Sequence, residues 1–231
     1  MPNFFKRCYL TLSWLLSIHF ISPAQENSTW NVPLNEINRW IIELEYPEKS
    51  TIEATSEGLV IDSYGGATLW LDSLLTGDYV IQYEREISLD KGENKRLSDL
   101  NQFWLAQEPH NEIKLKPRDG RLDSYNDLIL FYVGIGGNNN STTRFRRYDG
   151  SGERILLAEK NEKPFLLEAG RSDTICTFVR ASKRQTEVWM NGKPLFVEEG
   201  IQNTKGYFGL RLTASRQVIK WMTISKLPQN Q

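Results

Sequence analysis

The chain has 231 residues, and its 28 Lys+Arg against 29 Asp+Glu give a formal net charge of −1. This balance excludes a nucleic-acid binder that works by broad phosphate neutralisation. Hydrophobic residues make up 39% and charged residues 25%, which is typical of a globular chain that buries a core rather than of a disordered one. We expect one domain, because all-β sandwiches of this length commonly fold as a single unit.

The N-terminus has the pattern of a secretory signal peptide. Lys6 and Arg7 precede an apolar run from Cys8 to Ile21, and Ser22-Pro23-Ala24 supplies small residues at the expected cleavage site. A membrane anchor is the alternative, but a spanning helix needs about 20 apolar residues. We predict a signal peptide over 1–24, a single domain over 25–231, and a secreted or periplasmic protein with no membrane span after cleavage.

Cleavage after Ala24 would leave Cys176 as the single cysteine, so no intramolecular disulfide could form. Cys176 lies in an apolar-rich run and is expected to be a buried thiol. The fold must therefore be held together by its core, which a chain of this size permits.

The first predicted element of the mature chain is ambiguous. In the segment Asn35 to Glu45, apolar residues fall at Ile37, Trp40, Ile41 and Leu44. This spacing fits a short amphipathic helix, and an edge strand fits equally well.

From about residue 51 onward, short runs of β-branched and aromatic residues alternate with turn residues at the spacing of a sandwich. The dipeptide Asn191-Gly192 predicts a tight hairpin, because both central positions of a type I′ turn need positive φ. The predicted strands are Thr51 to Ala54, Gly58 to Ser63, Ala67 to Leu71, Gly77 to Leu89, Asn101 to Ala106, Leu128 to Ile135, Ser141 to Tyr148, Phe165 to Leu167, Thr174 to Ala181, Gln185 to Met190, Lys193 to Phe196, Tyr207 to Ala214 and Gln217 to Lys226.

Several common catalytic constellations are missing or weak. The stretch Gly134-Ile135-Gly136-Gly137 is followed by asparagines and a predicted strand, not by the helix that a phosphate loop needs. After cleavage His110 is the only histidine, so a zinc site with two histidines is excluded. His110 lies in a predicted loop, where it is either an exposed side chain or, less favoured, a general base.

The segment from Leu128 to Tyr148 carries the main chemical signal. Strand alternation puts Thr142, Arg144, Arg146 and Tyr148 on one face and Phe145 on the core side. Guanidinium groups bind carboxylate or sulfate in a bidentate manner, so this face suits an acidic sugar. The alternative is a set of ordinary surface ion pairs.

A second polar stretch, Ser98 to Leu105, mixes amides and a carboxylate with aromatic residues. Its candidate substrate-binding residues are Asp99, Asn101, Gln102 and Trp104. Gln102 and Trp104 alternate onto one face, and an indole beside an amide is a plausible sugar platform. A core position for Trp104 is equally compatible with the pattern. For the other tryptophans considered, Trp70, Trp189 and Trp221, we expect the core.

The asparagine run after Gly136-Gly137 adds Asn138 and Asn140 as candidate substrate-binding residues, because it forms a polar loop between two of these strands. Glu84 and Glu86 are spaced i, i+2 in a predicted strand and could act as the two carboxylates of a glycosidase. Acids on the outward face of an antiparallel sheet are the more common reason for such a pair.

Four blocks of the sequence carry a resemblance to a known family. They are SDLNQFW at 98–104, YVGIGGN at 132–138, TTRFRRY at 142–148 and GYFGLR at 206–211. The chain resembles an uncharacterised family of secreted domains from bacterial polysaccharide-utilisation loci, and it is similar to the YesU-like family. The resemblance implies a concanavalin-A-like β-jelly roll of two antiparallel sheets, as in many lectins, glucanases and uronate lyases. Neither the E-x-D-x-x-E motif nor the Q-x-H motif of catalytic members of that superfamily is present.

The leading hypothesis is a secreted polysaccharide lyase or glycoside hydrolase that acts on acidic, uronate-containing, pectin-like glycans. Arg144 and Arg146 would neutralise the uronate carboxylate, Tyr132 or Tyr148 would act as base or acid, and His110 is a reserve base. The first alternative is a non-catalytic carbohydrate-binding module, and the second is a structural or adhesion protein of the cell envelope.

We expect no cofactor. A structural calcium is left open because Asp119, Asp123 and Asp127 form an acidic loop, although their spacing fits no EF-hand. The oligomeric state is also left open.

Overall fold

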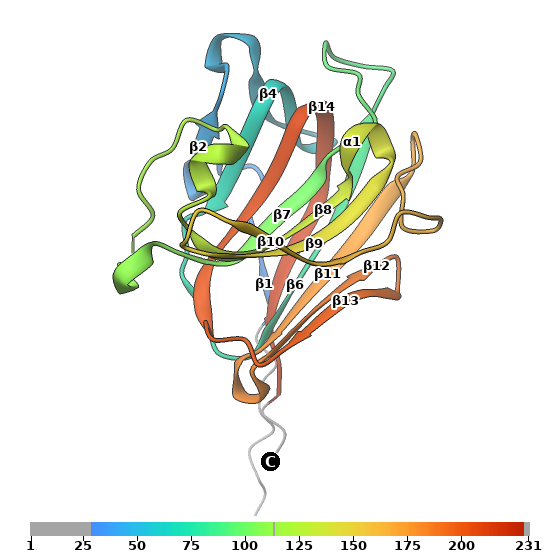
Figure 1. Ribbon diagram of the computed structural model, residues 1–231. Coiled ribbons are helices and arrows are strands. Elements are labelled where there is room, and N and C mark those ends of the chain that lie inside the picture. The colour runs from blue at the N-terminus through green and yellow to red at the C-terminus, as the bar shows by residue number, and fades with distance from the viewer. Residues whose placement is uncertain (1–28, 113, 229–231) are drawn as a thin grey trace, which may run out of the picture.

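The computed structural model describes residues 29–112 and 114–228 and shows an antiparallel β-sandwich (Figure 1). The predicted signal peptide lies outside the described residues. The strands are β1 (Thr29–Asn31), β2 (Trp40–Leu44), β3 (Thr51–Thr55), β4 (Gly58–Leu71), β5 (Leu75–Thr76), β6 (Tyr79–Ser88), β7 (Leu100–Gln107), β8 (Ile129–Gly136), β9 (Thr142–Asp149), β10 (Arg154–Glu159), β11 (Ser172–Arg180), β12 (Gln185–Met190), β13 (Lys193–Glu199) and β14 (Lys205–Lys226). Short helical turns are η1 (Ile37–Arg39), η2 (Pro47–Lys49), η3 (Pro109–Asn111), η4 (Leu122–Tyr125), α1 (Gly137–Asn140) and η5 (Ala181–Lys183).

The long last strand, β14, belongs to both layers of the sandwich. The strand order is β10-β9-β8-β7-β14-β6-β11-β12-β13. The first part of β14 pairs with β7 up to Arg211, and its second part pairs with β6 from Arg216 onward. We call β10-β9-β8-β7 with the first part of β14 the front sheet, and β6-β11-β12-β13 with the second part the back sheet. This architecture confirms the predicted all-β jelly-roll class.

The hydrophobic core lies between the two sheets. Alternate residues of each strand point inward, as the period of two requires. In the front sheet the Trp104 ring stacks on Phe131 and on Phe145, with centroid distances of 5.7 and 5.8 Å. The Phe145 ring in turn stacks on Phe196 of the back sheet at 5.4 Å. These aromatic contacts tie the two layers together.

A buried arginine lies where the pairing of β14 with β7 ends. Arg85 of β6 is fully buried and donates to the backbone carbonyls of Asn101 and Arg211 at 3.0 and 3.2 Å. Asn101 and Arg211 are the last residues paired between β7 and β14. Burial lowers the pKa of Arg85 to about 10, so the side chain is charged at neutral pH and can satisfy carbonyls where the ladder ends.

Most predicted strands are confirmed, with informative differences. The two pairs of strands predicted over 58–71 and 207–226 are the continuous strands β4 and β14, which pass from one sheet to the other. The segment 35–45 forms η1 followed by β2, which pairs with β4, so the edge-strand alternative is correct for its second half. The hairpin at Asn191-Gly192 is confirmed, because both residues have positive φ.

One prediction near the front-sheet edge is wrong, and one strand there was not predicted. The strand predicted over Phe165 to Leu167 is a loop, and β10 has no counterpart among the predicted strands. The four central residues of β10, Ile155 to Ala158, are all apolar, yet Leu156 is 50% exposed. An edge strand of this kind has no clear alternation of polar and apolar residues, so the period of two is not visible in its sequence.

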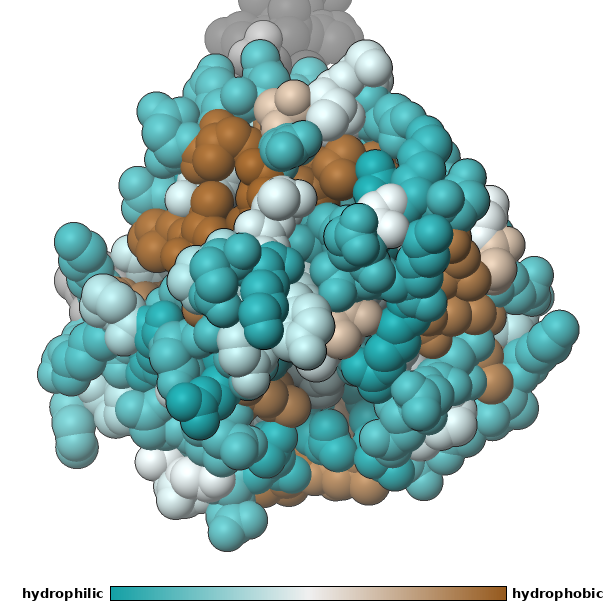
Figure 2. Space-filling view, turned by 90° about the horizontal axis from the view of Figure 1, so that it is seen from above, coloured by the Kyte–Doolittle hydropathy of each residue, from teal (hydrophilic) through white to brown (hydrophobic). Residues whose placement is uncertain are grey.

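Figure 2 looks down on one end of the sandwich and shows a mainly hydrophilic surface with separate hydrophobic patches. Within residues 29–112 and 114–228, no helix has the length and apolar character needed to cross a membrane.

Candidate functional site

The predicted arginine strand lies on the outer face of the front sheet. Cross-strand pairs connect Arg144 to Gly134, Gly134 to Asn101, and Asn101 to Arg211. Directly paired residues share a face, so these side chains project from the same side of the sheet. Tyr132 and Arg146 form the adjoining pair. We call the surface formed by Asn101, Tyr132, Arg144, Arg146 and Arg211 the arginine face.

Tyr132 forms the centre of the arginine face and leans over a glycine. A Cβ atom added at Gly134 would lie 2.4 Å from the Tyr132 hydroxyl oxygen, so only glycine leaves room for the phenol at this point. The guanidinium of Arg146 lies 5.9 Å from the centroid of the Tyr132 ring, within the range of a cation–π contact. Tyr132 and Arg146 are therefore positioned as one unit.

The remaining charges around the arginine face are mostly paired. Arg144 Nε lies 3.0 Å from Glu159 Oε2 of β10, and Arg96 Nη1 lies 3.0 Å from Asp99 Oδ2. Asp99 has a positive φ of 64° and also accepts hydrogen bonds from Ser98 Oγ and Asn101 Nδ2. Arg146 has no ion pair with any carboxylate of the described residues. It is thus the cation of this surface that is open to an external anion.

Unsatisfied polar atoms lie along the same face. Asn101 Oδ1, Arg211 Nε and the Tyr148 hydroxyl are buried and have no hydrogen-bond partner among the described residues. Buried polar atoms are normally paired, and a group without a partner points to water or a ligand at that position. Burial raises the pKa of the Tyr132 phenol and of the Tyr148 phenol, so both remain protonated at neutral pH.

A loop running from Glu108 to Asp127 covers the other half of this sheet face. Its Tyr125 packs against Phe103 and Trp70, with ring centroids 5.3 and 6.0 Å apart. The Arg211 guanidinium lies 5.2 Å from the Tyr125 ring centroid, and Nη1 donates to the Gly120 carbonyl at 2.9 Å. The loop therefore forms one wall of the arginine face, reaches β10 through the ion pair between Asp123 and Arg154, and leaves Arg144 and Arg146 partly exposed.

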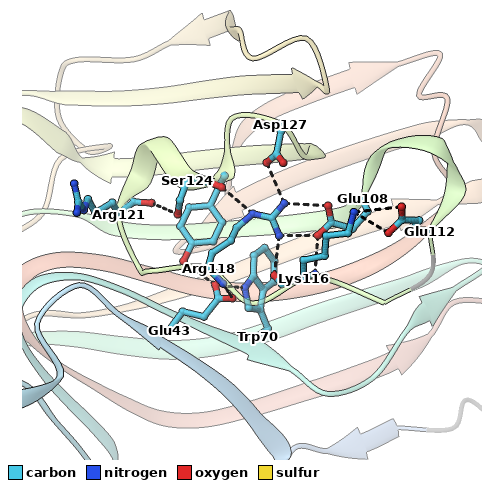
Figure 3. A network of polar contacts seen from close by, with 10 residues as sticks. Glu43, Trp70, Glu108, Glu112, Lys116, Arg118, Arg121, Ser124 and Asp127 are labelled. Atoms are coloured by element: carbon cyan, nitrogen blue, oxygen red, sulfur yellow. Dashed lines mark hydrogen bonds and ion pairs between the residues drawn. The ribbon is translucent and has the colours of Figure 1, made fainter.

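The loop is fixed by a network of polar contacts centred on one buried ion pair (Figure 3). Arg118 donates through Nη1 and Nη2 to the two carboxylate oxygens of Glu108, at 2.6 and 3.0 Å, and both side chains are almost fully buried. Arg118 also bonds to Asp127. Nearby, Glu43 of β2 accepts from the Trp70 indole and from the Tyr125 hydroxyl. This network makes the wall a rigid part of the fold.

The predicted sugar platform at Gln102 and Trp104 is wrong. Both residues are fully buried on the inner side of the front sheet. The Trp104 indole donates to Thr186 Oγ1 at 2.9 Å, and the Gln102 amide accepts from Tyr83 and donates to Thr177. The alternation put them on one face correctly, but that face is the core, so neither can contact a sugar.

The asparagine loop has two different roles. Asn138 is exposed at a left-handed turn and stays a candidate contact. Asn140 instead holds the neighbouring loop: Nδ2 donates to the Leu167 carbonyl and Oδ1 accepts from the Leu167 amide, each at 2.8 Å. These bonds make Asn140 a structural residue rather than a substrate contact.

Replacing Asn140 with alanine is expected to lower the free energy of unfolding by about 1–3 kcal/mol, because it removes both bonds at a residue with a φ of 61°. Asn140→Gly removes the same bonds but accepts the positive φ, so it should cost less. Urea unfolding of the three proteins tests this, and equal stability of wild type and Asn140→Ala would contradict the assigned role.

Other predicted residues lie away from the arginine face or are engaged elsewhere. His110 is exposed in η3. Glu84 and Glu86 contact Lys220, at 3.7 and 2.7 Å, on the outer face of the back sheet, which supports their assignment as ordinary surface acids. The acidic loop residues have separate partners, namely Arg121 N–H for Asp119, Arg154 for Asp123 and Arg118 for Asp127. Among the described residues, no group of three or more metal-ligating side chains is assembled.

Arg211 belongs to the arginine face although it was not predicted as a site residue. It lies in the GYFGLR block, where alternation indicates only which of its neighbours share its face. Its position beside Asn101 depends on the register between β7 and the distant β14, and no local pattern encodes that register.

Comparison with solved structures supports the fold. A protein of unknown function with a galectin-like fold from Bacillus subtilis superposes with a TM-score of 0.67 at 14% identity, covering 86% of this chain and 96% of that chain. The exoplasmic/lumenal domain of VIP36, in a form bound to Ca²⁺ and Man3GlcNAc, gives 0.61 at 12% identity, with coverage of 90% and 91%. The carbohydrate-binding module CBM66 from Bacillus subtilis gives 0.53 at 12% identity, with coverage of 79% and 92%.

Among curated proteins, none matches the chain. A family model does match, over residues 61–222, which include β6 to β13 and the whole arginine face. The chain thus belongs to the DUF6250 family, a domain family of unknown function.

Proposed function

We propose that the protein is a carbohydrate-binding domain that takes acidic glycans on the arginine face. The observation that carries the proposal is the Arg146 guanidinium, which lies against Tyr132 and has no carboxylate partner among the described residues. A uronate carboxylate would accept two parallel N–H bonds from such a group. Secretion, expected from the N-terminal segment, would place the domain where such glycans occur.

Two further features suit a sugar. The Tyr132 phenol stays protonated because burial raises its pKa, and its ring lies beside the Arg146 guanidinium. Leu156, which is paired with Arg146 and 50% exposed, supplies an apolar contact for a pyranose ring. The structural neighbours include a carbohydrate-binding module and a mannose-bound lumenal domain, which are compatible with this use of the fold.

Binding is better supported than catalysis by elimination or hydrolysis. A base must lose its proton near the working pH, whereas burial moves the pKa of Tyr132 and Tyr148 upward, away from neutrality. His110 is exposed in the loop and has no hydrogen bond from its side chain to the described residues. The lyase or hydrolase of the initial hypothesis would therefore need a proton acceptor that none of these residues supplies.

Titration calorimetry with tetragalacturonate tests the proposal. Arg146→Ala is expected to weaken binding by about tenfold or more, because a charge-assisted bidentate contact is lost. Arg147→Ala is the matched control: Arg147 is the next residue of β9, is 44% exposed and pairs with Glu198 at 3.7 Å on the opposite face. It should bind like wild type.

Raising the ionic strength should weaken wild-type binding, since an exposed ion pair is screened by salt. Equal affinity of the wild type and Arg146→Ala for tetragalacturonate would refute the proposal, as would an equal loss of affinity for a neutral tetrasaccharide in Arg146→Ala. Formation of unsaturated uronate, followed by its ultraviolet absorbance, would instead establish the lyase.

A further inference from the structure

A pocket of about 400 Å³ lies at one edge of β14. The part of β14 that lines it pairs with β6 of the back sheet, whereas the arginine face belongs to the front sheet. On this edge β14 pairs with β4 up to Ile219 and with β1 from Thr223 onward. Between them, the Met222 carbonyl still accepts from the Val32 amide at 2.9 Å, whereas Lys220 and Trp221 have no strand partner on that side within the described chain. A bulge between Ile219 and Trp221 accompanies this gap in the ladder. The gap lies between the end of β1 and the turn that joins β3 to β4.

Trp221 lines the pocket and is 38% exposed, so the expectation that it belongs to the core is wrong. Its indole Nε1 donates to Glu84 Oε2 at 3.1 Å, and Glu84 is the residue directly opposite on β6. The hydrogen bond holds the ring in one orientation while leaving part of its surface in contact with solvent. A fixed aromatic ring loses little conformational entropy when a ligand stacks on it.

Apart from Lys220 the rest of the lining is uncharged, and it combines apolar side chains such as Leu34 and Ala54 with polar ones. Asn31, Asn35 and Ser56 are exposed, and their side chains make no hydrogen bond to the described residues. The ammonium of Lys220 lies 2.7 Å from Glu86 and 3.7 Å from Glu84, so its charge is already compensated. The pocket thus offers amide and hydroxyl groups around an indole, with no free charge among the described residues to select an anion.

We propose that this pocket is a second saccharide subsite, which takes an uncharged pyranose unit stacked on Trp221. The C–H face of a pyranose is apolar and packs on an indole, while its hydroxyls need donors and acceptors such as amides and hydroxyls. Trp221 and Glu84 lie on the outer face of the back sheet, whereas the arginine face is the outer face of the front sheet. The two surfaces therefore bind different sugars independently.

The test is an NMR titration of the ¹⁵N-labelled protein with neutral tetrasaccharides: cellotetraose, xylotetraose, mannotetraose and maltotetraose. We expect at least one of them to shift the indole N–H signal of Trp221, which is assigned by its disappearance in Trp221→Phe. Trp221→Ala should weaken binding of that sugar at least tenfold, and Trp221→Phe should weaken it less because a ring remains.

Two control variants distinguish this subsite from nonspecific stacking and from the arginine face. Tyr64→Ala removes a ring that is 50% exposed and does not line the pocket, so it should bind like wild type. Arg146→Ala should also bind the neutral sugar like wild type, whether or not acidic glycans bind at the arginine face.

Should Trp221→Ala fail to fold, Asn35→Ala, which changes an exposed turn residue, is expected to weaken binding severalfold. The subsite is refuted by the absence of any shift with all four sugars, or by unchanged affinity in the folded variants Trp221→Ala or Asn35→Ala.

Discussion

Replacing Trp104 with alanine is expected to lower the free energy of unfolding by about 3–5 kcal/mol, the usual cost of truncating a large buried aromatic residue. The ring is fully buried and stacks on Phe131 and Phe145. Alanine would leave a cavity where the front sheet contacts the back sheet, and the neighbouring rings cannot fill it without shifting. Guanidinium chloride unfolding, monitored by far-UV circular dichroism, measures the change.

Two variants show whether the loss comes from the core position. Trp104→Phe keeps an aromatic ring and gives up the bond to Thr186, whose hydroxyl still donates to the Phe178 carbonyl, so it should lose less than half as much stability. Trp189→Ala removes an indole that is only partly buried and should also cost less. If Trp104→Ala were as stable as wild type, the core assignment would be wrong.

Replacing Arg118 with alanine is expected to destabilise the protein by about 3–5 kcal/mol, because the Glu108 carboxylate would be left buried without its counterion. Glu108 is 1% exposed and its two oxygens accept from Arg118. Glu108→Gln removes the charge and should cost less. Lys91→Ala breaks an ion pair between two exposed side chains and should leave the unfolding midpoint unchanged. Equal midpoints for Arg118→Ala and Lys91→Ala would contradict the role of the buried pair.

The same pair gives the protein an acid-sensitive stability. Burial alone would raise the pKa of Glu108, but the hydrogen bonds from Arg118 and from the Lys116 amide outweigh it and lower the pKa below the ordinary value of 4.5. A carboxyl with a lowered folded pKa contributes stability above the unfolded pKa and loses it as pH falls through the folded pKa. Wild type should therefore lose stability below about pH 4.5, and Glu108→Gln should lose less over that range.

Local alternation was enough to predict an all-β sandwich and the arginine strand, whereas the jelly roll was predicted from the resemblance to a known family. The period of two predicts that Arg144 and Arg146 lie on one face of their strand and Phe145 on the other, and the structure agrees. Alternation also paired Gln102 with Trp104 but could not say which face was the core. That choice depends on the back sheet, where Thr177 and Thr186 provide the partners.

What local pattern could not supply is the long-range register. Arg211 reaches the site because β14 pairs with β7 from more than a hundred residues away in sequence. The loop wall depends in the same way on Glu43, which contacts Tyr125 and the Arg118 amide across the sheet. Trp221 was misassigned because an apolar run at a bulged strand edge resembles a buried strand.

The double membership of β14 has a consequence for how the protein is made. The 22 residues Lys205–Lys226 follow all the other strands of the described residues, yet they occupy the middle of the strand order. During synthesis, β7 and β6 therefore leave the ribosome before β14. Until β14 has been made, the edge of each strand that will pair with it has no partner. Such edges are templates for pairing with other chains, so nascent or truncated chains that stop before β14 should depend strongly on chaperones. Completion of the C-terminal strand would close both sheets in one step.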